Sequence, residues 1–214
     1  MRLEDYTADA ICRAMGLSGF VEQPWTQAEN QTLRVVLTPS FHPELCLTFS
    51  QSSDSTPLSI AVLLDQLWAR PSVVCLPHEC EEIDMPSVVF DEVLALFATA
   101  RASYDPQRRY VYCDGMGSES CLSSRGGTQR LDAHVSSDAA VGKLVTRLIG
   151  LAWNSCRRAR VRNALAQAAR YLEIEYPLQD VPPQPPITRL AILGPPEEKR
   201  DCFEMLQRVK KGGT

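Results

Sequence analysis

The amino-acid sequence predicts an α+β protein in which a mainly antiparallel sheet packs against two or three helices. Short runs of alternating apolar and polar residues recur between proline or glycine turns, which is typical of antiparallel strands. Segment 136–171 instead has apolar residues at three- and four-residue steps, the period of an amphipathic helix. The chain has 214 residues, of which 44% are hydrophobic and 22% charged, so it is long enough to bury a core of its own.

The first part of the chain predicts a helix and then a meander of strands. Apolar residues near helical spacing predict a helix over residues 3–17, which ends in a glycine-containing segment. Segments 31–37 and 44–50 alternate on either side of a proline-containing turn and predict a hairpin. Segment 57–68 suits either a buried strand or a short helix, and we favour a strand to about Leu64 because it extends the meander.

An acidic segment separates this meander from the next helix. Residues 71–76 form a β-like run, and the residues after it predict an exposed acidic loop. Its acidic side chains are Glu79, Glu81, Glu82 and Asp84. Pro86 suits the first turn of a helix that extends to about Ala102, with Asp84 as a candidate cap.

Two antiparallel strands are predicted in the middle of the chain. Residues 110–116 are aromatic and β-branched, residues 129–135 alternate, and a glycine-rich connection joins the two. Turn signals lie at Asp114-Gly115 and at Arg125-Gly126-Gly127. These two strands lead directly into the longest helical pattern of the sequence.

The helix predicted over residues 136–171 begins at a good N-cap, Ser137 or Asp138, and we expect a bend or pause near Trp153. Four closely spaced prolines then predict an extended linker, followed by a β-like run and a final helix. The predicted organisation is an α+β domain, a proline-rich linker, and a C-terminal strand and helix docked on that domain: residues 1–178, 179–186 and 187–214.

Composition and charge argue against several classes of protein. The net charge of −4 disfavours a general nucleic-acid binder. No run approaches the roughly 18 apolar residues that a membrane span requires, and residues 1–5 lack the apolar segment of a signal peptide. Eight scattered cysteines in a chain of this size predict reduced thiols. We therefore expect a cytoplasmic protein that binds neither nucleic acid nor membrane.

Candidate metal-binding residues are few. Cys75, His78 and Cys80 are suitable ligand types, but a zinc site would have to be completed by Cys113 and Cys121, eight residues apart. Buried thiols beside an acidic loop are the favoured interpretation. We expect no metal, no cofactor and no catalytic residue.

The most distinctive charge feature is a basic helix. Residues 139–172 contain seven lysines and arginines and no acidic residue. These cations either form a solvated face, paired with the acidic segment, or bind a protein partner; nucleic acid is disfavoured by the overall acidity and the absence of interleaved aromatics. The candidate partner-binding residues are Glu79, Glu81, Glu82, Asp84, Arg157, Arg158, Arg160 and Arg162.

The stretch Tyr110-Val111-Tyr112-Cys113-Asp114-Gly115-Met116, followed by a turn, a strand and an apolar helix, resembles a pattern of bacterial polymorphic-toxin immunity proteins. The run from Leu33 to Glu44 is similar to their N-terminal hairpins, and the resemblance covers about half the chain. It implies a non-enzymatic cytoplasmic protein that binds a cognate toxin and occludes its active site. The acidic segment would face a basic toxin cleft, which is slightly preferred, or the arginine helix an acidic one.

Two other classes remain open. An adaptor or structural subunit of a secretion or regulatory assembly would have the same architectural patterns. A small enzyme would use Cys113, Asp114 and His134, provided that the two predicted central strands pair in a register that brings these residues together.

Overall fold

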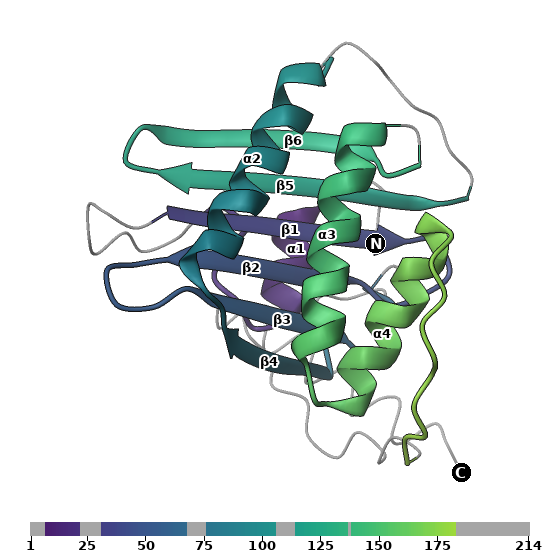
Figure 1. Cartoon of the computed structure of the whole chain (residues 1–214). Coiled ribbons are helices and arrows are strands. Elements are labelled where there is room, and N and C mark those ends of the chain that lie inside the picture. Colours follow the sequence, from purple (N-terminus) through teal and green to yellow (C-terminus); the bar gives the residue numbers. More distant parts are fainter. Residues whose placement is uncertain (1–6, 22–30, 68–75, 106–113, 137, 183–214) are drawn as a thin grey trace, which may run out of the picture.

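The computed structural model describes residues 7–21, 31–67, 76–105, 114–136 and 138–182. Within these ranges the chain forms a six-stranded antiparallel sheet in the order β4-β3-β2-β1-β5-β6 (Figure 1). The strands are β1 (Gln31–Pro39), β2 (Leu45–Gln51), β3 (Pro57–Leu63), β4 (His78–Asp84), β5 (Met116–Ser124) and β6 (Gly127–His134). The helices are α1 (Ala8–Ala14), α2 (Ser87–Ser103), α3 (Ala139–Ser155) and α4 (Ala159–Ala169), followed by a 3₁₀ turn (Arg170–Leu172). The predicted α+β class is confirmed.

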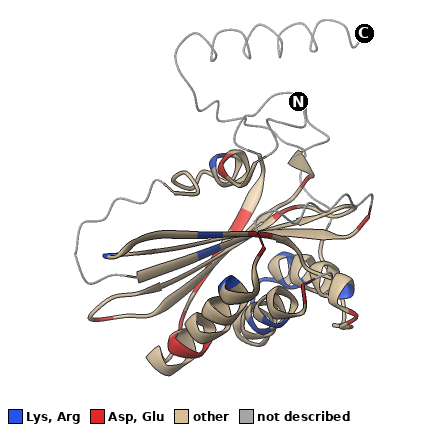
Figure 2. Ribbon diagram, turned by 90° about the horizontal axis from the view of Figure 1, so that it is seen from above, with Lys and Arg blue, Asp and Glu red and all other residues tan. Residues whose placement is uncertain are grey.

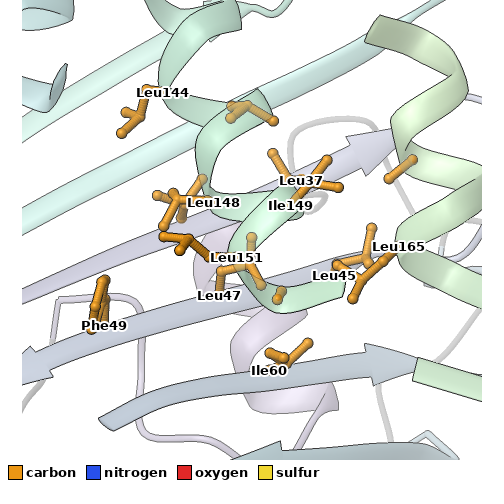
Figure 3. Close-up of a cluster of buried hydrophobic side chains, with 14 of the residues drawn as sticks. Leu37, Leu45, Leu47, Phe49, Ile60, Leu144, Leu148, Ile149, Leu151 and Leu165 are labelled. Atoms are coloured by element: carbon orange, nitrogen blue, oxygen red, sulfur yellow. The ribbon is translucent and has the colours of Figure 1, made fainter. Parts of the chain in front are cut away.

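The main core lies between one face of the sheet and helices α2, α3 and α4 (Figure 2). Strand alternation directs Val35, Leu47 and Ile60 to this face in one row across β1, β2 and β3. The apolar stripe of α3 covers them with Leu148 and Ile149, both almost fully buried (Figure 3). Each such side chain stabilises the fold by about 1.5–3 kcal/mol relative to leaving it in water, so this layer sets the position of α3 on the sheet.

A second, smaller core covers the opposite face of the sheet. The short helix α1 packs Ile11, Cys12 and Met15 onto residues of β1 and β2 that include Val36 and Cys46. The hydroxyl of Thr7 caps α1 by accepting a hydrogen bond from the Ala10 N–H at 3.2 Å. The centre of the sheet is therefore buried on both faces, and β1 has no consistently exposed side.

Several sequence predictions are confirmed in detail. Residues 31–37 and 44–50 form the antiparallel β1–β2 hairpin, and residues 57–63 form strand β3. Asp138 is the N-cap of α3, where its carboxylate accepts hydrogen bonds from the N–H groups of Ala140 and Val141. The predicted turn at Arg125-Gly126 joins β5 to β6, with Gly127 at a φ of 111° that favours glycine.

Three predictions are wrong. The acidic segment is an edge strand, β4, and not a loop. Asp84 ends this strand and accepts a hydrogen bond from the Thr56 N–H, while Pro86 occupies the cap position of α2. The glycine-rich connection is strand β5, because its backbone pairs with both β1 and β6.

The long helical pattern is interrupted, since α3 and α4 are separated at residues 156–158, slightly later than the expected pause near Trp153. Of the predicted strand at 110–116, residues 110–113 lie outside the described part of the chain, and Met116 already begins β5. The first residues of the predicted N-terminal helix, most of the run at 71–76, and residues 183–214 also lie outside it.

The chain continues past the 3₁₀ turn as an extended segment that runs back along α4 (Figure 1). The Tyr176 ring stacks on Trp153 at a centroid distance of 4.6 Å. The Asn163 side chain then exchanges two hydrogen bonds with the Gln179 backbone, at 2.7 and 2.9 Å. In the described ranges, no helix combines the length and apolar character that crossing a membrane would require.

Two serine hydroxyls of β5 lie inside the main core without a described hydrogen-bond partner. Ser118 is 1% exposed and Ser120 is fully buried, and both side chains point to the face of the sheet that forms the main core. A buried hydroxyl without a partner costs about 1–3 kcal/mol. We therefore expect Ser120→Ala to raise the free energy of unfolding by about 1 kcal/mol, measured by urea denaturation.

The matched control is Ser59→Ala, since the Ser59 hydroxyl donates a hydrogen bond to Glu82 at the protein surface. This control should lower stability slightly or leave it unchanged. A clear loss of stability in Ser120→Ala would contradict the interpretation.

Candidate functional site

The four acidic candidates all lie on edge strand β4, where they alternate between the two faces of the sheet. Glu79 and Glu81 are half-buried and point toward the side that carries α4. Glu82 and Asp84 are exposed and point toward the opposite side. The acidic segment is therefore divided into two pairs, and does not form a single acidic patch.

The best-built feature of this region is the contact between Glu81 and the start of α4. One carboxylate oxygen of Glu81 accepts a hydrogen bond from the Arg157 N–H at 2.8 Å, and the other accepts one from the Arg158 N–H at 3.0 Å. Arg158 is the N-cap residue of α4, and its own side chain does not cap the helix. A carboxylate from a distant strand thus satisfies N–H groups at the positive end of this helix.

The other two arginine candidates have partners inside the protein. Arg160 forms an ion pair with Glu79 at 3.3 Å, and its Nη2 donates a hydrogen bond to the Pro182 carbonyl at 2.9 Å. The Arg162 guanidinium lies over the Trp153 ring, 4.2 Å from its centroid. The prediction that cations of this helix pair with the acidic segment is confirmed for Arg160.

Arg157 and Arg158 differ from these two. Both residues are exposed, and within the described part of the chain neither guanidinium has an acidic partner. Their backbone N–H groups are held by Glu81, so the two side chains project from a fixed point where α3 ends and α4 begins. This corner, defined by Glu81, Arg157 and Arg158, is the candidate functional site, and we call it the arginine corner.

The exposed acids Glu82 and Asp84 make local contacts with the neighbouring strand. Glu82 accepts a hydrogen bond from the Ser59 hydroxyl at 2.8 Å, and Asp84 accepts one from the Thr56 N–H at 3.2 Å. Their carboxylates remain open to solvent, so they keep capacity for a partner's cations on the side of the sheet away from α4.

The hypothetical enzyme site is only partly described. Asp114 and His134 lie close together, but the contact is between the imidazole and the Asp114 backbone carbonyl, and Cys113 lies outside the described residues. A Cβ atom on Gly115, which has a φ of 136°, would come within 2.1 Å of the His134 ring, so only glycine fits there. Burial lowers the pKa of His134, while the Asp114 carbonyl opposes that change. The described contacts of the imidazole also include its close approach to Gly115 and a hydrogen bond between its Nδ1 and the Ser136 hydroxyl at 2.9 Å.

Of the four cysteines considered as metal ligands, the two that the structure describes, Cys80 and Cys121, lie far apart. Cys80 lies on β4 and Cys121 on β5, and four inter-strand steps separate these strands, or about 19 Å at the usual spacing. In the described ranges no three potential ligands are grouped closely enough to hold a metal ion. Cys121 is buried as expected, whereas Cys80 is exposed on the edge strand. Cys75 and Cys113 lie outside these ranges.

Sequence reasoning missed a pair of carboxyl groups on the α1 side of the sheet. Glu119 on β5 and Asp132 on β6 are direct cross-strand neighbours. Burial and then the nearby Asp132 raise the pKa of Glu119, and burial raises the pKa of Asp132. The Ala8 N–H donates a hydrogen bond to Glu119 at 3.2 Å, which connects α1 to the sheet. In the sequence Glu119 lies in the predicted glycine-rich connection and Asp132 is a single polar position of a predicted strand, so only the strand register brings the two together.

Comparison with known proteins identified no relative: no protein-family model, no curated protein and no solved structure matches this chain.

The Glu81 contact should be important for stability. Removing the carboxylate in Glu81→Ala leaves two backbone N–H groups at the start of α4 without their acceptor, which typically costs about 1–2 kcal/mol. We expect that loss in the free energy of unfolding by urea denaturation. Glu82→Ala, the adjacent exposed acid, is the matched control and should change stability by less than about 0.5 kcal/mol. Equal effects of the two substitutions would contradict this account.

The Glu119–Asp132 pair predicts a pH dependence of stability. Because the folded protein raises the pKa of Glu119 above its ordinary 4.5, this group favours folding most below pH 4.5, and that contribution is lost as pH rises through its folded-state pKa. Glu119→Gln should therefore be more stable than the parent at pH 7 and similar at pH 4. Its amide oxygen can still accept the Ala8 hydrogen bond.

The measurement is urea unfolding at a series of pH values. Asp54→Asn, in the exposed turn between β2 and β3, provides the control for removal of one carboxylate. If the Glu119→Gln protein is less stable than the parent at pH 7, the fold favours the charged form of Glu119 and the prediction is wrong.

Proposed function

We propose that this chain is a bacterial immunity protein, which binds a cognate protein toxin in the cytoplasm and occludes its active site without catalysis of its own. The sequence resemblance to polymorphic-toxin immunity proteins motivates this proposal. The observation that carries it is the arginine corner: two adjacent exposed guanidinium groups, without a described acidic partner, on a backbone fixed by Glu81.

The physical chemistry of the corner suits protein recognition. Arginine is enriched among residues that dominate binding energy, because its planar group forms paired hydrogen bonds with carboxylates. Holding the backbone of Arg157 and Arg158 in place reduces the conformational entropy lost on binding. The two adjacent positive charges also attract an acidic partner surface at long range.

The edge strand β4 adjoins this corner and offers a second means of contact. Within the described residues β4 pairs only with β3, and an edge strand is a position at which a strand of another protein can add to a sheet. Glu82 and Asp84 add negative charge on the far side. We infer that the arginines lie at the centre of the interface, and the partners that Glu79 and Glu81 have within the chain support this choice.

The direct test is co-production with the polypeptides encoded next to this chain. Each neighbour is induced in a bacterial host with and without the chain, and growth is measured. We expect one neighbour to arrest growth alone and to form a stoichiometric complex with the chain, which restores growth. The proposal fails if no neighbour is toxic, or if growth is not restored by the intact chain.

The arginine corner can then be tested within that complex. Arg157→Ala and Arg158→Ala should each weaken toxin binding by about tenfold or more, since they remove candidate hot-spot side chains and leave the backbone N–H groups bound to Glu81. Binding is measured by titration calorimetry. The matched control is Arg125→Ala in the exposed β5–β6 turn, which should bind like the parent. If all three variants bind equally well, the interface lies elsewhere.

A further inference from the structure

An open cavity lies between α3 and the 3₁₀ turn, which Figure 1 shows at the upper end of α4. Its volume is about 470 Å³, which is within the usual range of sites for small ligands. The arginine corner lies at the other end of α4, so the length of this 11-residue helix, about 16 Å, separates the two. The side chains that give the cavity its charge and its apolar surface are Ala139, Lys143, Arg147, Tyr171, Leu172 and Glu173.

The α3 wall of this cavity carries two cations. Lys143 is exposed, and none of the ion pairs in the described part of the chain includes it. Arg147 lies one helical turn further along and lines the same cavity. Its Nη2 pairs with Glu92 at 2.6 Å, but its Nε is buried and has no hydrogen-bond partner among the described residues. A buried donor without an acceptor is unfavourable, so this wall favours a group that is negatively charged.

The wall formed by the turn carries an acid, Glu173, that no described ion pair joins to the cations of α3. Its backbone has a φ of 61°, in the left-handed region that residues other than glycine adopt uncommonly. Two hydrogen bonds fix this conformation, from the Glu173 N–H to the Arg170 carbonyl and from the Ile174 N–H to the Ala169 carbonyl, both at 3.1 Å. Glycine would suit the turn better, so the turn itself does not require a glutamate at this position.

Apolar surface completes the cavity. Ala139 and Leu172 line it from α3 and from the turn, and Tyr171 adds an aromatic side chain. The Tyr171 hydroxyl accepts a hydrogen bond from the Phe41 N–H at 3.1 Å and lies 3.0 Å from His42 Nδ1, so its position is fixed by the β1–β2 turn. The cavity therefore combines an apolar surface with positive charge on one wall and negative charge on the other.

We propose that this cavity binds a free amino acid with an apolar side chain, in its zwitterionic form. The carboxylate of the ligand lies against Lys143 and Arg147, its ammonium group lies against Glu173, and its side chain packs on Ala139 and Leu172. A ligand with both charges matches the two walls, whereas a ligand with a single charge leaves one wall next to a like charge or without a counter-ion. The site goes beyond the binding function proposed above and does not depend on it.

The experiment is a heteronuclear NMR titration of the full chain with L-phenylalanine up to about 10 mM, since a ligand of this size in an open site binds weakly. Phenylpropionate and phenethylamine are matched probes, because the first lacks the ammonium group and the second lacks the carboxylate. We expect saturable amide shifts at the residues of the cavity wall with L-phenylalanine. Each of the two single-charge probes should bind at least about tenfold more weakly.

Two variants assign the charges of the ligand to the two walls. Lys143→Gln should weaken L-phenylalanine binding about tenfold and abolish its advantage over phenethylamine, because the contact to the carboxylate is lost. Glu173→Gly should abolish the advantage over phenylpropionate and leave the urea midpoint equal to or above that of the parent, because glycine suits the left-handed backbone. Arg125→Gln, in the exposed β5–β6 turn, is the control and should bind like the parent.

Three results would overturn the proposal. The first is the absence of saturable shifts at the cavity wall with L-phenylalanine. The second is phenylpropionate or phenethylamine binding as tightly as L-phenylalanine, since a single charge would then be sufficient. The third is a Lys143→Gln or Glu173→Gly protein that binds L-phenylalanine as tightly as Arg125→Gln does, since the charged walls would then have no part in binding.

Discussion

The structure depends on the burial of the central strands on both faces. β1 lies between β2 and β5, and its alternate side chains enter the two cores, with Val35 under the helical layer and Val36 under α1. A one-residue shift in register would turn every side chain of β1 to the opposite face of the sheet, so the two cores together specify the register of this strand. Here a one-residue shift would move Arg34 into the main core, so the buried arginine helps to specify the register of β1.

The edge of the sheet is organised by a different interaction, the contact of Glu81 with the start of α4. Through this contact the edge strand β4 is attached to the helical layer that covers the centre of the sheet. In this contact the Glu81 carboxylate is occupied by backbone N–H groups, while the side chains of Arg157 and Arg158 stay exposed. The Glu81 carboxylate therefore both stabilises the fold and positions the arginines proposed for recognition. The charged residues of this region are of two kinds, those with partners inside the protein and those available to a partner protein.

The sequence predicted correctly those strands and helices in which the apolar residues recur at the spacing of the element. The β1–β2 hairpin, β3 and α3 all combine regular alternation or helical spacing with apolar residues that enter a core. β5 was missed because it directs Ser118 and Ser120 into the core, where apolar residues are the rule. β4 was missed because glutamates are uncommon in strands, although an edge strand tolerates charge. The pairing of Arg160 with the acidic segment was foreseen from charge alone. The Glu81 contact and the Glu119–Asp132 pair depend on strand register and could not be foreseen from the sequence.

The strand order has a consequence for synthesis of the chain. β1 can pair with β2 as soon as that hairpin has emerged, but its other neighbour, β5, begins at Met116, which is 77 residues after the end of β1 at Pro39. At a translation rate of about 5–20 residues per second, the second edge of β1 stays unpaired for on the order of 4–16 s during synthesis. During that interval β1, which the folded protein buries on both faces, is an open edge, the form in which strands pair with other chains. The nascent protein is therefore most prone to aggregation before its second half is translated, and slower translation across residues 40–115 would extend that risk.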